Sequence, residues 1–220
     1  MKIPDGYPLE AAGPVFCAGI TMFTPLVKYG ADKGGLRVGV VGIGGLGQMG
    51  VRLAKAMGNS VTAISTSPNK KAAAREIGVD NFLVSTDPDC MKNSAGSLDL
   101  ILNTVSADHD INTYLPLLVH LRQPLYRDWR MTRSLNVFQA AKGVCVQIGA
   151  AMKPHSVGQI QLLWKALSIC GSIIGGMPNT QRVIDFCHEH NIVPKIKLIT
   201  AKELDNTYEE LSKKNDSILR

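Results

Sequence analysis

Three glycines stand at a spacing that suits a phosphate chain. The segment "VVGIGGLGQMG" contains Gly42-x-Gly44-x-x-Gly47 between an apolar run and a helical pattern. At this spacing the first glycine permits a tight turn, the second lets the backbone approach a pyrophosphate, and the third lets helix and strand pack closely. Free N–H groups at the start of the helix then face the phosphates. The pattern predicts a dinucleotide site; a glycine-rich turn that binds nothing is the weaker alternative.

The end of the second apolar run, "AISTSPNKK", indicates which dinucleotide. An enzyme that uses NAD places Asp or Glu about 20 residues after the glycines, where the acid accepts hydrogen bonds from the ribose hydroxyls. Here the stretch contains Ser65, Thr66 and Ser67, then Lys70 and Lys71, and no carboxylate. Hydroxyl and ammonium groups suit a 2′-phosphate, which a carboxylate would repel. We therefore expect NADP(H); the alternative is a plain helix cap followed by two solvated lysines.

A single cysteine raises a separate question. In "PVFCAGITMF", Cys17 lies in a small-residue apolar run with no other cysteine or histidine nearby. It either fills the core or is one ligand of a metal site whose other ligands lie elsewhere. The five cysteines form no C-x-x-C pair, so neither a disulfide framework nor a self-contained zinc knot is indicated. Cys187, His188 and His190 ("CHEH") are interpreted as a polar helix end rather than a metal site.

Short β-branched runs alternate with helical patterns and must position these residues. Near-continuous apolar strands that alternate with helices indicate a parallel sheet covered on both faces. Six such strands predict the α/β, doubly wound (Rossmann) nucleotide-binding fold. We expect strands at 36–41, 60–65, 81–85, 98–104, 143–149 and 168–176, and helices at 46–58, 67–78, 109–118, 156–167 and 180–190.

Composition excludes some classes of protein. The chain has 220 residues, 45% of them hydrophobic, and a formal net charge of +6, half of which falls in the segment 119–141. That segment interrupts the alternation, and we interpret it as a surface excursion with a solvated arginine face rather than a nucleic-acid site. No apolar run approaches the roughly 18 residues that a membrane span needs, and the N-terminus lacks the apolar centre of a signal peptide, so a cytoplasmic location is expected.

Five segments together resemble a known family: "PLEAAGPVFCAGITMFTPL", "VGIGGLGQMGVRLAKAMG", "ISTSPNKK", "LDLILNTVSADHDINTYLPLL" and "VCVQIGAAMKPHSV". They resemble the zinc-containing medium-chain alcohol dehydrogenases, and within them the cinnamyl-alcohol-dehydrogenase-like, NADP-dependent branch. The resemblance covers nearly the whole chain except 119–141 and the last few residues.

The resemblance implies roles for particular residues. Cys17 matches a catalytic zinc ligand, and Thr21 matches a threonine near the nicotinamide. The family's other zinc ligands come from a barrel-like catalytic domain that precedes this segment, so zinc is not expected to be retained by Cys17 alone. The residues that match cofactor contacts are Thr21, Gly42, Gly44, Gly45, Leu46, Gly47, Ser65, Thr66, Ser67, Lys70, Thr104, Val105, Ile148, Gly149, Ala150, Ser172 and Ile174.

The resemblance also implies an organisation and an activity. We expect 1–28 to connect to the catalytic domain, 29–192 to be the NADP-binding domain with the insertion at 119–141, and 193–220 to belong again to the catalytic domain. The family activity is zinc-assisted, NADP(H)-dependent interconversion of an aldehyde and a primary alcohol. An inactive NADP-binding or dimerisation module is the alternative, and the last strand matches one that pairs across a dimer axis.

Overall fold

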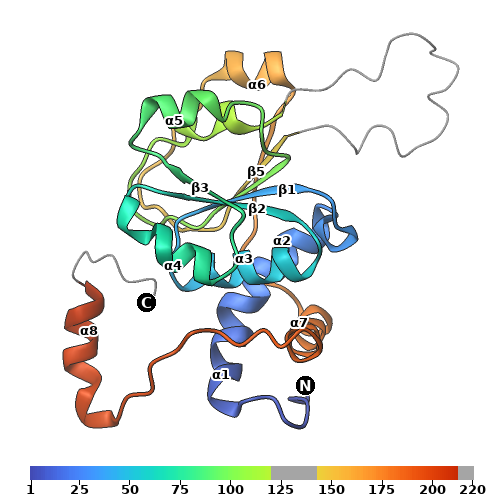
Figure 1. Cartoon of the computed structure of the whole chain (residues 1–220), viewed down its shortest axis with the longest axis vertical. Coiled ribbons are helices and arrows are strands. Elements are labelled where there is room, and N and C mark those ends of the chain that lie inside the picture. The colour runs from blue at the N-terminus through green and yellow to red at the C-terminus, as the bar shows by residue number, and fades with distance from the viewer. Residues whose placement is uncertain (120–142, 213–220) are drawn as a thin grey trace, which may run out of the picture.

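A six-stranded parallel sheet forms the centre of the computed structural model, which describes residues 1–119 and 143–212 (Figure 1). Its strand order is β3-β2-β1-β4-β5-β6, and every neighbouring pair is parallel. The order reverses direction between β1 and β4, which is the switch point where doubly wound folds bind ligands. This confirms the predicted fold class. The strands are β1 (Arg37–Val41), β2 (Ser60–Ser65), β3 (Asn81–Val84), β4 (Leu100–Asn103), β5 (Val144–Gln147) and β6 (Ser168–Gly171).

Helices cover both faces of the sheet, as Figure 1 shows. On one face lie α2 (Ile20–Lys28), α3 (Gly45–Ala56), α4 (Lys71–Glu76) and α7 (Met177–Glu189). On the other lie α5 (Pro88–Asn93), α6 (Gln159–Lys165) and the short 3-10 turns η4 (Ile111–Thr113) and η5 (Leu115–Leu117). The remaining helical elements are α1 (Leu9–Pro14), η1 (Val15–Gly19), η2 (Ala31–Lys33), η3 (Pro68–Lys70), η7 (Ala201–Glu203) and α8 (Leu204–Ser212).

Alternation along each strand divides the core in two. In β1, Val38 and Val40 face the α3 side, whereas Val41 faces the α5 side. In β4, Leu102 faces the α3 side and Ile101 faces the α5 side. All four residues of that strand are buried. Because both faces are covered, the central strands need to be apolar throughout, which explains the continuous apolar runs in the sequence.

The N-terminal segment is a helical run that sequence reasoning missed. The elements α1, η1 and α2 follow one another without a break, and η1 is a single π-helical stretch around Cys17. By length and composition alone the span Leu9–Lys28 would pass as a membrane crossing, so the expectation that no segment is long and apolar enough is wrong. Over half of the apolar stretch in this span is nevertheless buried inside the protein, because the helix packs into the core beside α3 and α7.

Other boundaries also differ from the prediction. The helix expected at 109–118 is instead the two 3-10 turns η4 and η5, because Pro116 lacks the N–H that a longer helix would use. The last strand ends at Gly171 rather than at 176, and α5 was not predicted. The expected arginine-rich excursion 119–141 lies outside the described residues apart from its first residue, Val119.

Candidate functional site

The turn from β1 to α3 has the geometry that the glycine spacing predicts. Gly42 has φ of +86°, a backbone conformation that favours glycine. A Cβ on Gly47 would lie 1.9 Å from the Gly42 carbonyl oxygen, so only glycine lets the helix approach the turn this closely. A Cβ on Gly44 would meet no atom within 4 Å, which leaves open space beside the backbone.

The start of α3 presents donors to that open space. The first bond inside the helix runs from the Gln48 N–H to the Gly44 carbonyl oxygen at 2.9 Å. The N–H groups of Gly45, Leu46 and Gly47 therefore precede the intrahelical ladder and, together with the helix dipole of this 12-residue helix, favour an anion. The geometry is that of a phosphate cradle, and the residues present fit a dinucleotide.

Two further turns close around the first at the switch point. Thr104 follows β4, and its hydroxyl donates to Val41 at 2.8 Å or to Gly42 at 3.0 Å, in both cases to the backbone carbonyl oxygen. A Cβ on Gly149, after β5, would lie 2.3 Å from the Val105 carbonyl oxygen. The turns that hold Thr104, Val105, Ile148, Gly149 and Ala150 therefore touch one another beside the glycine turn.

The adenosine end of the site is built from hydroxyl groups. Ser65 ends β2 and is 8% exposed, and its Oγ accepts a hydrogen bond from the Ser67 N–H at 3.2 Å. Ser67 is at the N-cap position of η3, with Pro68 next, as the sequence predicted, but its hydroxyl makes no cap hydrogen bond. Thr66 is exposed and Lys70 half-buried in the same turn. No carboxylate occurs from Ser65 through Lys70.

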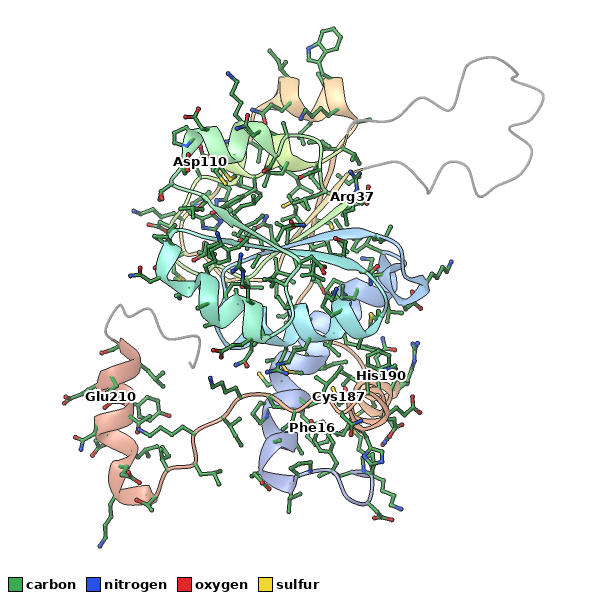
Figure 2. All side chains as sticks on the ribbon, in the orientation of Figure 1. Phe16, Arg37, Asp110, Cys187, His190 and Glu210 are labelled. Carbon is green, nitrogen blue, oxygen red and sulfur yellow. The ribbon has the colours of Figure 1, made fainter. Side chains whose placement is uncertain are left out.

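Cys17 lines the same cavity as the start of α3, next to the glycine turn. Its side chain is exposed, and it lines a cavity of about 540 Å³ together with Gly45 and Gln48 of α3. The far wall of this cavity comes from Pro194–Lys197 and from α8, whose residue Glu210 is labelled in Figure 2. The Lys195 N–H donates to Gln48 Oε1 at 3.3 Å and so ties this wall to α3.

The residues around Cys17 do not fit zinc. A catalytic zinc needs about three protein ligands, and the part of the chain that the structure describes contains no group of three His, Cys, Asp or Glu side chains able to hold a metal.

Burial raises the pKa of the Cys187 thiol to about 12, and Cys187 is fully buried on the side of α7 that faces the N-terminal helix (Figure 2). The interpretation of "CHEH" as a polar helix end therefore holds for His188 and His190, which are exposed, but is wrong for Cys187.

The helix that contains Thr21 packs against the turn that contains the last predicted contacts. Thr21, 6% exposed, is in α2, and α2 contacts the turn after β6, because a Cβ on Gly175 would lie 2.5 Å from Thr24 Oγ1. Ser172 and Ile174 are in this turn, and the Ser172 N–H donates to the Gln147 carbonyl oxygen at 3.0 Å. Ser172 and Ile174 thus follow β6 at the same end of the parallel sheet as the turns after β1, β4 and β5, and the adenosine turn follows β2.

Sequence reasoning missed a polar cluster at the same edge. Asn103, the fully buried last residue of β4, contacts Gln147 and His109 at 2.8 Å each. The available signal was the pattern "LILN", an amide that closes an otherwise apolar buried strand and therefore needs partners inside the fold.

Comparison with known proteins shows which sequences and structures this chain resembles. A family model described as zinc-binding dehydrogenase matches residues 45–120. Cinnamyl alcohol dehydrogenase 8 of Arabidopsis thaliana is 42% identical over 214 residues, which are 97% of this chain and 54% of that protein. An NADP-dependent alcohol dehydrogenase C of Mycolicibacterium smegmatis is 39% identical over 211 residues, 96% of this chain and 54% of that protein.

Solved structures give the same picture. A cinnamyl alcohol dehydrogenase from Sorghum bicolor superposes with a TM-score of 0.87 at 34% identity, over all of this chain and 56% of that one. A cinnamyl alcohol dehydrogenase from Helicobacter pylori, solved with NADP(H), superposes with a TM-score of 0.77 at 31% identity, over 96% of this chain and 54% of that one. The chain spans about half the length of the curated relatives it matches.

Proposed function

Because this chain belongs to the zinc-containing alcohol dehydrogenase family, on its cinnamyl-alcohol-dehydrogenase-like branch, we propose that it binds NADP(H) and serves the interconversion of an aldehyde and a primary alcohol. The observation that carries the proposal is the switch-point edge itself. There the open space at Gly44, the donors at the start of α3 and the hydroxyl-lined adenosine turn lie in the order of a dinucleotide's parts. When bound, the nicotinamide supplies the hydride.

The chain's own residues bind and orient the cofactor. The N–H groups of Gly45 and Leu46 hold the pyrophosphate, while Ser65, Thr66, Ser67 and Lys70 receive the 2′-phosphate. The turns at Thr104–Val105 and Ile148–Ala150 hold the middle of the cofactor, and Thr21, Ser172 and Ile174 lie at its nicotinamide end. No step is assigned to a metal, because the described residues contain no group of three His, Cys, Asp or Glu side chains able to hold one.

Titration with reduced cofactors tests this function. The intrinsic fluorescence of NADPH or NADH is followed as the full chain is added at pH 8. We expect NADPH to bind at least about tenfold more tightly than NADH, since a carboxylate is absent and a phosphate partner present at the adenosine turn. Equal or tighter binding of NADH contradicts the cofactor assignment, and binding of neither contradicts the function.

A binding or dimerisation module without turnover is the second candidate. The lack of a zinc ligand set among residues 1–119 and 143–212 favours it over an enzyme that works unaided. We also propose that the chain divides into three segments. Residues 29–192 form the NADP-binding domain, and 1–28 and 193–220 belong with a catalytic domain. Zinc-dependent aldehyde reduction by this 220-residue chain alone would contradict the second candidate.

We further propose a homodimer through the last strand and a cytoplasmic location. β6 is the edge of the sheet, and an unpaired edge can accept another strand. Ile173 and Ile174, directly after it, are 80% and 58% exposed. Sedimentation of the chain and of an Ile174→Glu variant tests the dimer, which the variant should dissociate.

The state of the cysteines supports the proposed cytoplasmic location. All five cysteines are free, as in a reducing compartment.

A further inference from the structure

The cluster around Asn103 is a closed set of hydrogen bonds between the ends of β4 and β5. Asn103 Oδ1 accepts from the Val105 N–H at 3.3 Å, and its Nδ2 lies 2.8 Å from both Gln147 Oε1 and His109 Nε2. His109 Nδ1 lies 2.7 Å from the Ala107 carbonyl oxygen. Asn103 is completely buried, so each of these bonds replaces one that water would otherwise make.

These partners leave one arrangement of protons. The Ala107 carbonyl can only accept, so Nδ1 of His109 carries the hydrogen. The amide oxygen of Asn103 is engaged by the Val105 N–H, so its Nδ2 faces His109 and donates. Nε2 of His109 must then be the acceptor. The cluster therefore requires His109 to be neutral and in its Nδ1–H form.

The cluster binds the backbone of Val105, which lies between the two cofactor-facing turns. A Cβ on Gly42 would come within 3.0 Å of Val105 Cγ2, and a Cβ on Gly149 would overlap the Val105 carbonyl. Val105 is therefore packed between the glycine turn and the turn after β5, and the Asn103 bond to its N–H determines where it sits. A change in that bond moves the wall of the proposed cofactor site.

We propose that Asn103 and His109 are positioning residues of the cofactor site, and that protonation of His109 weakens NADP(H) binding. A proton on Nε2 would face the Nδ2 hydrogens of Asn103, so the pair would separate, or the amide would rotate and release the Val105 N–H. This rests on the proposed function. Imidazole is the side chain that normally changes charge between about pH 5 and 8.

Other groups surround the His109 ring and set its response. The His155 ring lies 4.9 Å from it and the Tyr114 ring 5.9 Å, both measured between centroids. Asp108 and Asp110 flank it in the chain, and Asp108 is paired with Lys153 at 2.7 Å. Burial raises the pKa of Tyr114, so this neighbour stays neutral in the range considered. His155 is thus the second imidazole beside His109 and the natural control.

Binding measured against pH tests the proposal. NADPH and NADH are titrated into the wild-type chain, His109→Gln and His155→Gln at pH 8.0, 7.0, 6.0 and 5.5. Glutamine keeps an acceptor for Asn103 without titrating. Because the phosphate of NADPH itself titrates near pH 6, the measured quantity is the difference between variant and wild type. We expect the wild type to lose about tenfold more affinity than His109→Gln on acidification, within the usual range of coupling between sites.

Two further results decide the matter. His155→Gln should follow the wild type; if it instead removes the pH dependence, the wrong histidine has been chosen. The ¹⁵N shifts of the His109 ring should report the Nδ1–H form at pH 8, with or without cofactor. A different tautomer, or equal pH dependence in His109→Gln and wild type, overturns the proposal. If neither dinucleotide binds at pH 8, the proposed function is overturned instead. The ¹⁵N shifts of the His109 ring then still test the hydrogen-bond cluster.

Discussion

Two regions of the molecule differ in how complete they are. The cofactor edge, formed by the turns 42–47, 65–70, 103–106 and 148–150, is tied together by close glycine contacts and buried hydrogen bonds. The thiol face, formed by Cys17 with Pro194–Lys197 and α8, offers one exposed thiol. It also carries exposed Leu198, Leu204 and Tyr208. The difference teaches that a phosphate turn is specified by residues a few positions apart, whereas a metal site needs ligand side chains from several elements.

The segments 1–28 and 195–220 also differ in how much apolar surface they expose. The family resemblance implies that both lie next to the catalytic domain, so apolar patches that this domain would cover are expected on both. In 1–28 the expectation is wrong, because Met1 and Leu9 are the only large hydrophobic side chains of that segment that are exposed. In the described part of 195–220 it is correct, because Leu198, Leu204, Tyr208 and Leu211 are exposed.

The largest expected effect breaks the cofactor edge. Gly47→Ala puts a Cβ 1.9 Å from a backbone oxygen, so the turn or the helix must shift. We expect a loss of about 2 kcal/mol or more in the free energy of unfolding, and no measurable dinucleotide binding. Urea unfolding and fluorescence titration measure the two. Gly13→Ala, in α1 where a Cβ meets nothing within 4 Å, is the matched control on the thiol side and should leave both unchanged or slightly improve stability. Equal effects would contradict the comparison.

A smaller effect is expected from charge at the adenosine turn. Ser67→Asp places a carboxylate where the 2′-phosphate is expected and should weaken NADPH binding by about 10- to 100-fold while NADH binding is kept or improved. Ser67→Asn, which has similar size and no charge, serves as the control. An unchanged preference between the two cofactors in Ser67→Asp would show that the phosphate lies elsewhere.

The ion pair at the opposite end of the sheet should contribute less. Asp99 accepts from the Arg37 side chain at 2.8 and 3.0 Å, linking β1 to β4. Burial raises the pKa of Asp99, but the Arg37 hydrogen bonds outweigh this and hold it below its ordinary value. The stabilisation is thus present at neutral pH and is lost as the pH falls below about 4.

Asp99→Asn measures that contribution. Because both side chains reach solvent, we expect a loss of about 1 kcal/mol in the free energy of unfolding at pH 7, and less at pH 3. Asp205→Asn, at an exposed position on α8, is the control and should change nothing. A loss that is as large at pH 3 as at pH 7 would exclude the ionised pair as its cause.

The smallest effect is expected at the thiol face. Cys17→Ser should leave dinucleotide affinity within about twofold and stability within about 0.5 kcal/mol, since the side chain is exposed and isolated from other ligands. Metal analysis of the purified wild-type chain should find no stoichiometric zinc. Tightly bound zinc that the variant loses would mean that Cys17 has ligand partners after all.

Sequence reasoning reached the fold and the cofactor edge because their signals are local. The strand β2 was predicted to the residue, and the glycine turn was predicted with a reason for each glycine. The helix Leu9–Lys28 was missed because its two prolines and two glycines interrupt the periodicity, and packing against α3 and α7 overrides them. The helix expected at 109–118 did not form for the opposite reason, because Pro116 removes a donor and packing does not replace it.

By itself the sequence determined the succession of six strands, the phosphate turn and the absence of an acid at the adenosine end, since each depends on residues a few positions apart. Only the tertiary structure decided that Cys17 shares a cavity with Gly45, and that Asn103, Gln147 and His109 meet at one edge. The reason is that neighbouring parallel strands bring together residues far apart in the chain. Asn103 and Gln147, 44 positions apart, meet through the register of β4 and β5, which no local pattern encodes.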